Sequence, residues 1–275
     1  MNVQAALTLA TQMLKDAGIP DPARDARKLM AASLGVDVGR VTLHLRDPLE
    51  DVPEAAFFAD TMERAERKPI SHLLGWREFF GRRFLVTPEV LDPRPETETL
   101  IEAALSENFE DLLDLGIGTG CILVTLLAER PKATGIGTDI SGAALSVAGR
   151  NAAAHGVEDR CALIESDWFA VVGGQFDLIV SNPPYIALDE MADLAPELAY
   201  EPRMALTDES DGLAAYRVIA RDAGPHLKPG GRLMVEIGWT QGADVAAIFK
   251  AQGFVGVRIL QDMDGRDRVV LAQTR

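Results

Sequence analysis

Apolar residues recur at intervals of three and four along the first part of the chain, which is the spacing of amphipathic helices. The first run begins at Val3 and stops at Gly18, and similar patterns cover 22–34 and 53–67. No convincing alternating strand pattern occurs before residue 76. We therefore expect roughly the first 75 residues to form a small helical bundle.

A different pattern begins at residue 76, where aromatic and β-branched runs flank Gly81-Arg82 as in a hairpin. Beyond the hairpin, helical stretches alternate with short apolar strands, which predicts a mostly parallel sheet covered by helices on both faces. The expected strands are 111–116, 133–140, 161–166, 176–182, 231–238, 254–260 and 267–273, and the expected helices are 96–107, 120–129, 141–154, 211–226 and 241–251. The last two strands follow each other directly, so they predict an antiparallel edge pair in this mixed seven-stranded α/β sheet. The domains are expected at 1–75 and 76–275.

Composition narrows the class of protein. With 47% hydrophobic and 25% charged residues, the 275-residue chain is typical of folded soluble proteins. The first residues lack the pattern of a signal peptide, and no stretch approaches a membrane span. The only cysteines, Cys121 and Cys161, have neither metal-ligand nor disulfide spacing, which suits the cytoplasm. A net charge of −15 disfavours a nucleic-acid partner, because Lys and Arg supply most affinity for phosphates.

A glycine-rich turn follows the first expected strand of the sheet. Residues 111–120 read DLLDLGIGTG, and ligands of α/β sheets bind at the carboxyl ends of strands. A dinucleotide fingerprint would need its third glycine where Cys121 stands, so a nicotinamide cofactor is disfavoured. Asp139 ends the next strand, where a carboxylate can accept the hydroxyls of a ribose. The turn predicts a nucleoside site, with a tight packing turn as the alternative.

The segment Asn182-Pro183-Pro184-Tyr185 begins at the last residue of the expected strand 176–182 and so lies at the same edge of the sheet. The nitrogen of a planar amide is a poor nucleophile, because its lone pair is delocalised. The Asn182 oxygen and the Pro183 carbonyl can each accept one N–H of such a group, so that the lone pair can point at an activated methyl. Tyr185 offers a flat face for stacking. The alternative is a simple turn after a strand.

Several motifs together resemble the HemK/PrmC family, the glutamine N5-methyltransferases of peptide-chain release factors. The resemblance covers nearly the whole chain and rests on GWREFFGRRFLVTPEVLDPRPETE, DLGIGTG, TDIS, SDWF, FDLIVSNPPYI, EPRMAL, DGLAAYRVI, LKPGG, VEIG and DRVV. It implies a class I methyltransferase fold of the Rossmann-like type. It also implies S-adenosylmethionine as cofactor, S-adenosylhomocysteine as product, no metal, and class 1 release factors as protein substrates.

The resemblance also implies roles for individual residues. The cofactor-binding residues are Gly116, Ile117, Gly118, Thr119, Gly120, Asp139, Asp167, Trp168 and Asn182, with Asp167 and Trp168 beside the adenine. Pro183, Pro184 and Tyr185 complete a glutamine pocket around Asn182, of which Asn182, Pro183 and Tyr185 carry the catalytic role. The helical region before residue 75 corresponds to a release-factor-docking domain. We expect a monomeric cytoplasmic enzyme that contacts neither nucleic acid nor membrane.

Three alternatives stay open. They are a glutamine methyltransferase of a ribosomal protein, an adenine N6-methyltransferase acting on a flipped base, and a non-catalytic module that binds release factors. Two interpretations also remain for Arg94, Glu96 and Glu98, which either act at the pocket or only start a helix. Trp239 is expected to be a packing residue.

Overall fold

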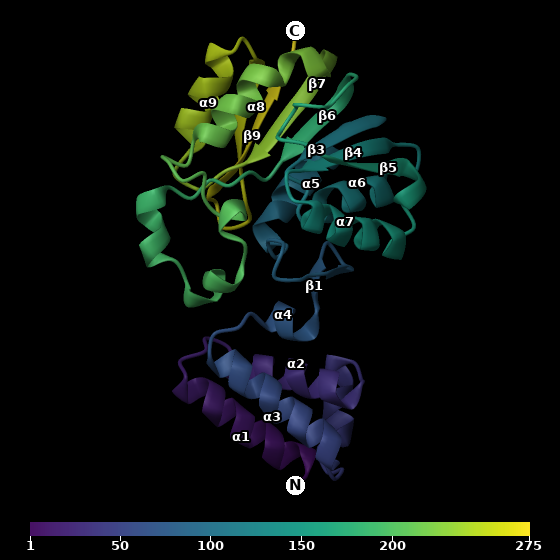
Figure 1. Cartoon of the computed structure of the whole chain (residues 1–275), viewed down its shortest axis with the longest axis vertical. Helices are drawn as coiled ribbons and strands as arrows, with labels where there is room; N and C mark the ends of the chain where they lie inside the picture. Colours follow the sequence, from purple (N-terminus) through teal and green to yellow (C-terminus); the bar gives the residue numbers. More distant parts are fainter. The chain divides into compact units, whose positions relative to one another are not determined.

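The computed structural model describes all 275 residues and divides into two compact units (Figure 1). The helical unit comprises Met1–Trp76 and Ala195–Tyr200. The sheet unit comprises Arg77–Leu194 and Glu201–Arg275. No helix in either unit has the length and apolarity needed to cross a membrane.

Four α-helices and one 3₁₀ helix form the Met1–Trp76 part of the helical unit. They are α1 (Val3–Asp16), α2 (Pro22–Leu34), η1 (Val38–His44), α3 (Asp51–Ala65) and α4 (Ile70–Leu74). Leu14, Leu29 and Phe57 meet in a common core, as amphipathic spacing predicts. A buried ion pair of 2.8 Å joins Asp25 on α2 to Arg64 on α3. The expected helical bundle is confirmed, although η1 and α4 were not anticipated.

The hairpin opens the sheet unit with β1 (Trp76–Phe79) and β2 (Arg82–Leu85). Its aromatic residues Phe79 and Phe84 are fully buried in the core. The Phe80 N–H at its turn donates a 2.8 Å hydrogen bond to the Glu98 carboxylate. The hairpin is thereby fastened to α5 (Glu98–Leu105), the helix that follows the PRPETE segment.

A seven-stranded sheet forms the centre of the sheet unit, with the strand order β5-β4-β3-β6-β7-β9-β8. Its strands are β3 (Asp111–Leu115), β4 (Thr134–Asp139), β5 (Cys161–Glu165), β6 (Phe176–Ser181), β7 (Leu227–Glu236), β8 (Val255–Gln261) and β9 (Asp267–Gln273). The strands from β5 to β7 are parallel, and β9 runs antiparallel to both β7 and β8. The mixed sheet with its antiparallel edge pair is confirmed.

Helices cover both faces of this sheet (Figure 1). They are α5, α6 (Cys121–Glu129) and α7 (Gly142–Ala154) on one face and α8 (Ala214–Asp222) and α9 (Gly242–Ala251) on the other. Consecutive strand residues point to opposite faces, and accordingly Leu112 belongs to the core under α6 whereas Leu113 belongs to the core under α8 and α9. The site lies at one edge of this three-layered unit.

Several expectations about the second half of the sheet unit were wrong in detail. The helix expected at 211–226 is shorter, because Gly224-Pro225 ends it in the 3₁₀ turn η7 (Gly224–His226). Strand β7 begins four residues early at Leu227, and a register shift against β6 accommodates the two glycines of LKPGG. Trp239 is 62% exposed instead of packed.

A long irregular segment, 182–213, connects β6 to α8. It contains three short 3₁₀ helices that periodicity did not predict: η4 (Leu188–Asp193), η5 (Pro196–Tyr200) and η6 (Arg203–Ala205). Residues 195–200 belong to the helical unit, where Glu197 lies 3.2 Å from Arg64. Residues from Glu201 onward return to the sheet unit.

Candidate active site

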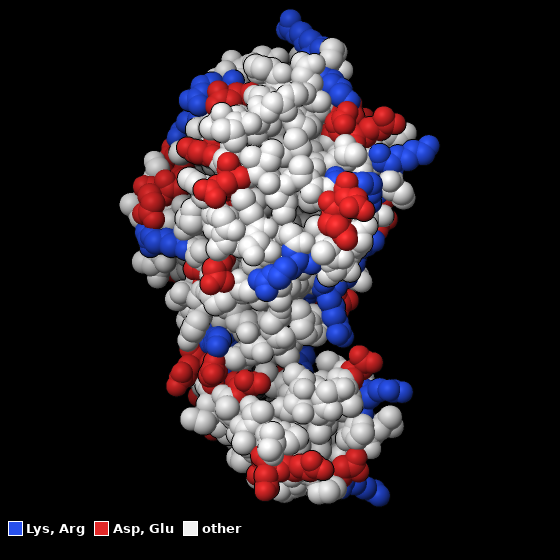
Figure 2. Space-filling view, turned by 45° about the vertical axis from the view of Figure 1, so that its right-hand side comes forward, with Lys and Arg blue, Asp and Glu red and all other residues white.

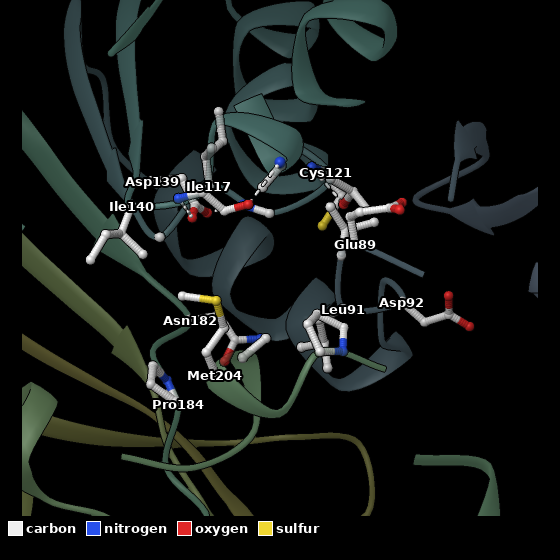
Figure 3. A pocket seen from close by; sticks show the side chains of 18 of the residues that line it. Glu89, Leu91, Asp92, Ile117, Cys121, Asp139, Ile140, Asn182, Pro184 and Met204 are labelled. Atoms are coloured by element: carbon white, nitrogen blue, oxygen red, sulfur yellow. Dashed lines mark hydrogen bonds between the residues drawn. The ribbon is translucent and has the colours of Figure 1, made fainter. Parts of the chain in front are cut away.

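A cavity of about 230 Å³ lies at the carboxyl ends of β3, β4, β5 and β6 (Figure 3). Three chain segments that are far apart in sequence complete it, namely 89–97, 116–121 and 202–205. Most of the residues expected to bind cofactor or substrate are on its wall. They are Gly116, Ile117, Gly118, Thr119, Asp139, Asp167, Trp168, Asn182 and Pro184.

The glycine turn leaves the cavity open beside β3. Gly116 and Gly118 have φ values of +71° and +53°, a conformation that favours glycine. A Cβ atom added at either position would meet no atom within 4 Å, so the space beside them is free for a ligand. The turn is therefore shaped for close approach of a bound molecule and not only for internal packing.

The other members of the turn also have a packing role. A Cβ atom on Gly120 would lie 3.2 Å from that of Ala148, so this glycine lets α6 approach α7 closely, and it is absent from the cavity wall. The Ile117 side chain fills the space over Gly137 on β4. Ile117 thus completes the core while still contacting the cavity.

Asp139 is held rigidly at the end of β4. Its Oδ2 accepts the Gly118 N–H at 3.0 Å and its Oδ1 accepts the Ser141 N–H at 2.9 Å. Each carboxylate oxygen has about two acceptor positions, so one on each remains for a ligand. Two parallel acceptors of this kind suit the vicinal hydroxyls of a ribose. Asp167 and Trp168 follow β5 on the same wall.

Asn182 lies at the end of β6 with its carboxamide in the cavity wall. Its Nδ2 donates to the Thr97 hydroxyl over a long 3.5 Å. Its Oδ1 is buried and has no hydrogen-bond partner. An unpartnered buried acceptor costs about 1–3 kcal/mol, which a bound N–H donor would recover. Because this oxygen has almost no exposed surface, a substrate amide reaches it only when neighbouring side chains shift.

The remaining NPPY residues differ in position. Pro184 contacts the cavity, whereas Pro183 and Tyr185 are not among its lining residues. Tyr185 packs against the core under α8 and α9, and burial raises the pKa of its phenol further above the ordinary value. Its carbonyl accepts the Gln241 side chain at 2.9 Å. The roles of Pro183 and Tyr185 at the substrate stay predictions.

The PRPETE segment lines the cavity opposite the glycine turn. Arg94 lies on the wall and donates to Glu201 at 2.6 Å, which ties the segment to 202–205. Asp92 is buried and pairs with Arg77 at 3.2 Å. Glu98 fastens the hairpin and Glu96 is exposed. The roles of Arg94, Glu96 and Glu98 could not be decided from the sequence. Nor did the sequence indicate a role for Glu201, the first residue of the EPRMAL motif.

Two polar residues near Asn182 were missed altogether. Thr97 and Glu236 are buried, with exposed fractions of 1% and 0%. Burial raises the pKa of Glu236 to about 7, against the lowering effects of the Thr97 hydroxyl and of the Arg268 charge. The motifs PRPETE and VEIG were the only available signal, because nothing in the sequence shows that the two residues meet. No cluster of three or more His, Cys, Asp or Glu side chains is arranged to hold a metal ion.

Two family models match this chain, one over its N-terminal helices and one over part of the sheet unit. Residues 5–75 match the PrmC N-terminal domain, and residues 92–211 match the methyltransferase small domain. A methyltransferase from Pyrococcus furiosus has a similar structure, with a TM-score of 0.54 and 16% identity over 80% of this chain and 96% of that one. The expected class I methyltransferase fold is confirmed.

Two relatives match almost end to end. A release factor glutamine methyltransferase of Cereibacter sphaeroides is 57% identical over 99% of both chains. One of Agrobacterium fabrum is 43% identical over 98% of this chain and 96% of its own. The family expected from the motifs is thereby confirmed.

Proposed function

This chain belongs to the family of release factor glutamine methyltransferases, and on that premise we propose that it methylates a release factor. The target is the side-chain nitrogen, N5, of the glutamine in the Gly-Gly-Gln motif of class 1 peptide-chain release factors. The observation that carries the proposal is the buried Asn182 Oδ1, an acceptor without a partner in the wall of the cavity.

The cavity residues fit S-adenosylmethionine as the methyl donor. Open space beside Gly116 and Gly118 accommodates a ligand against the backbone. Asp139 keeps acceptor positions for ribose hydroxyls, and Trp168 offers an apolar surface on the same wall. When bound, this cofactor supplies a methyl group activated by a sulfonium and leaves as S-adenosylhomocysteine. We propose that no metal takes part.

Asn182 and Pro183 orient the substrate amide. We assign one N–H of the glutamine to Asn182 Oδ1 and the other to the Pro183 carbonyl. Hydrogen bonds that gain charge on one partner are worth about 1.5–3 kcal/mol each, so both strengthen as the nitrogen becomes positive. With both hydrogens held, the nitrogen lone pair has one fixed direction. The new N–CH3 bond replaces the S–CH3 bond, and the methylated nitrogen then becomes neutral by releasing one N–H proton to water. Pro184 lines the pocket around the amide, and Tyr185 supports it from its place against the core.

Charge favours a protein substrate over the nucleic-acid alternative. The chain carries a net charge of −15, and a duplex partner needs basic surface. On the face shown in Figure 2, blue and red side chains are interspersed and no continuous basic track is present. A ribosomal protein glutamine is the nearer alternative, and the family of the relatives favours the release factor.

We further propose that residues 1–75 form the release-factor-docking domain of a monomeric, cytoplasmic enzyme. The match of residues 5–75 to a family-specific N-terminal domain supports this role. The remaining residues, 76–275 apart from Ala195–Tyr200, then carry the hairpin and the catalytic sheet unit.

Mass spectrometry of a release factor incubated with the protein and S-adenosylmethionine tests the proposal. We expect one added methyl on the Gly-Gly-Gln glutamine with the wild type. Asn182→Ala should abolish the mark while still binding S-adenosylhomocysteine through Gly116, Gly118 and Asp139, with weakened affinity because Asn182 is also expected at the cofactor. Asn108→Ala, at an exposed asparagine, is the matched control. An unmodified glutamine with the wild type, or methyl transfer to RNA or DNA instead, would reject the assignment.

A further inference from the structure

Three polar side chains from separate parts of the chain lie at one side of the cavity, where Asn182 and Thr97 line it and Glu236 is buried outside the lining. Asn182 follows β6, Thr97 precedes α5, and Glu236 ends β7. Asn182 Nδ2 donates to Thr97 Oγ1, and the Thr97 hydroxyl is near enough to Glu236 to lower the pKa of that carboxyl. Neither oxygen of Glu236 has a close hydrogen-bond partner. A carboxylate is thus buried where only one short polar side chain separates it from the asparagine.

We propose that Glu236 and Thr97 are positioning residues that set the orientation of the Asn182 carboxamide. An ionised carboxylate only accepts hydrogen bonds, so the single Thr97 proton points to Glu236. The Thr97 oxygen is then left as an acceptor and selects the NH2 end of Asn182. Oδ1 is consequently the end left without a partner, available to the substrate's N–H donors once the neighbouring side chains shift.

The opposite orientation would be unproductive. With Asn182 reversed, its NH2 group would face the NH2 group of the glutamine, and two donors cannot bond each other. Asparagine alone does not choose between the two orientations, because its two ends have nearly the same shape. The inference rests on the proposed function and deepens it, since it explains why PRPETE accompanies an NPPY site.

Protonation of Glu236 would remove the preference for one orientation of the Asn182 carboxamide. A neutral carboxyl can itself donate to Thr97, which frees the Thr97 proton for Asn182 Oδ1 and favours the reversed amide. The charged and titratable groups that act on Glu236 are Arg268, Arg94, Glu96, Tyr185, Tyr216 and Cys121. The two arginines favour its ionised form, whereas Glu96 and burial oppose it. Because burial raises its pKa to about 7, turnover should rise with pH through the neutral range.

Kinetics of three variants on a release factor test the inference. Thr97→Val removes the hydroxyl at similar volume and should lower kcat about tenfold or more, with little change in KM, which the remote docking contacts determine. Thr97→Ser restores the hydroxyl and should recover most of this loss. Glu236→Gln should flatten the acidic limb of the kcat profile. Thr125→Val is the matched control, because the Thr125 hydroxyl on α6 is equally buried but has no partner and lies outside the cavity wall.

A spectroscopic measurement keeps the inference separate from the proposed function. The side-chain NH2 signals of Asn182, assigned by their loss in Asn182→Ala, should titrate near neutral pH in the wild type and not in Thr97→Val or Glu236→Gln. This holds even if the wild type leaves a release factor unmodified, which would reject the function alone. An NH2 signal insensitive to pH in the wild type, or wild-type kcat in Thr97→Val, would overturn the inference.

Discussion

Gly118 donates its backbone N–H to Asp139 Oδ2 at 3.0 Å, across 21 residues of sequence. This bond joins the glycine turn after β3 to the acid at the end of β4. The Ser141 N–H holds the second oxygen of the same carboxylate. The two halves of the expected nucleoside site are therefore one hydrogen-bonded structure, whose carboxylate cannot rotate without breaking two bonds.

The Asp139→Asn variant should lose cofactor affinity. The NH2 group of the new asparagine would face a backbone N–H donor, that of Gly118 or Ser141. An NH2 group also cannot accept a hydrogen bond from a ribose hydroxyl. Loss of a charged hydrogen bond is worth about 1.5–3 kcal/mol, so the Kd for S-adenosylhomocysteine should rise about tenfold or more. Calorimetric titration measures this change. Asp264→Asn, at an exposed turn, is the control, and equal affinities of the two variants would contradict the assignment.

Gly120→Ala should destabilise the sheet unit through packing as well as backbone strain. The residue has a φ of +79°, and the new Cβ would lie 3.2 Å from the Ala148 Cβ. The left-handed conformation costs about 1–2 kcal/mol and overpacking about 1–3 kcal/mol more. Urea unfolding measures the sum.

Gly156→Ala separates these two contributions. Gly156 has a φ of +66°, but an added Cβ there would meet no atom within 4 Å. It should therefore show only the conformational cost. If both variants unfold at the same urea concentration, the close approach of α6 and α7 at Gly120 has no energetic importance.

Arg94→Gln should loosen the segment that closes the cavity. Arg94 is the ion-pair partner of Glu201, whose side chain is only 2% exposed. Removing one partner of a buried pair costs about 3–5 kcal/mol, although burial already raises the pKa of Glu201 and protonation would limit the loss. Equilibrium unfolding at neutral pH measures it. Arg203→Gln, in the exposed pair with Glu209, should change the unfolding midpoint little, and an equal effect of both would contradict the interpretation.

The residues at the ligand-binding edge of the sheet were predictable from sequence, because the carboxyl ends of parallel strands all lie at the same edge. The runs in β3 and β6 are short and mostly apolar, and their carboxyl ends must meet at one edge. Gly116, Asp139 and Asn182 were consequently expected together before any contact was known, and all three line one cavity.

The back of the site was not predictable in this way. Thr97 and Asn182 are 85 residues apart, and their contact depends on how α5 packs under the sheet. Met204 lines the cavity from an irregular segment, whose sequence has no periodic pattern from which its position could be predicted. Trp239 was expected to pack because of its residue type alone, and residue type does not reveal that its position lies on the surface.

Glu236 should give the protein a pH dependence of stability opposite to that of its activity. Burial raises its pKa from 4.5 to about 7. A group with a raised pKa in the folded state contributes stability that is complete below the unfolded value and is lost as pH rises through the folded value. Between about pH 5 and pH 8 this loss is at most about 3 kcal/mol. Asp114, whose pKa burial raises to about 8, adds a similar trend in wild type and variant alike.

Glu236→Gln removes the contribution of Glu236 to the pH dependence of stability and leaves that of Asp114 in place. The variant should equal or exceed the wild type in unfolding free energy near pH 8, lose that advantage near pH 5, and still turn over more slowly at the higher pH. Urea unfolding across this range measures the difference, with Glu165→Gln at the exposed end of β5 as control. Parallel stability curves for wild type and Glu236→Gln would mean that the carboxyl titrates alike in both states. A buried charge kept at a cost in stability is expected only where its ionised form does something, and here that is to hold Asn182 in one orientation.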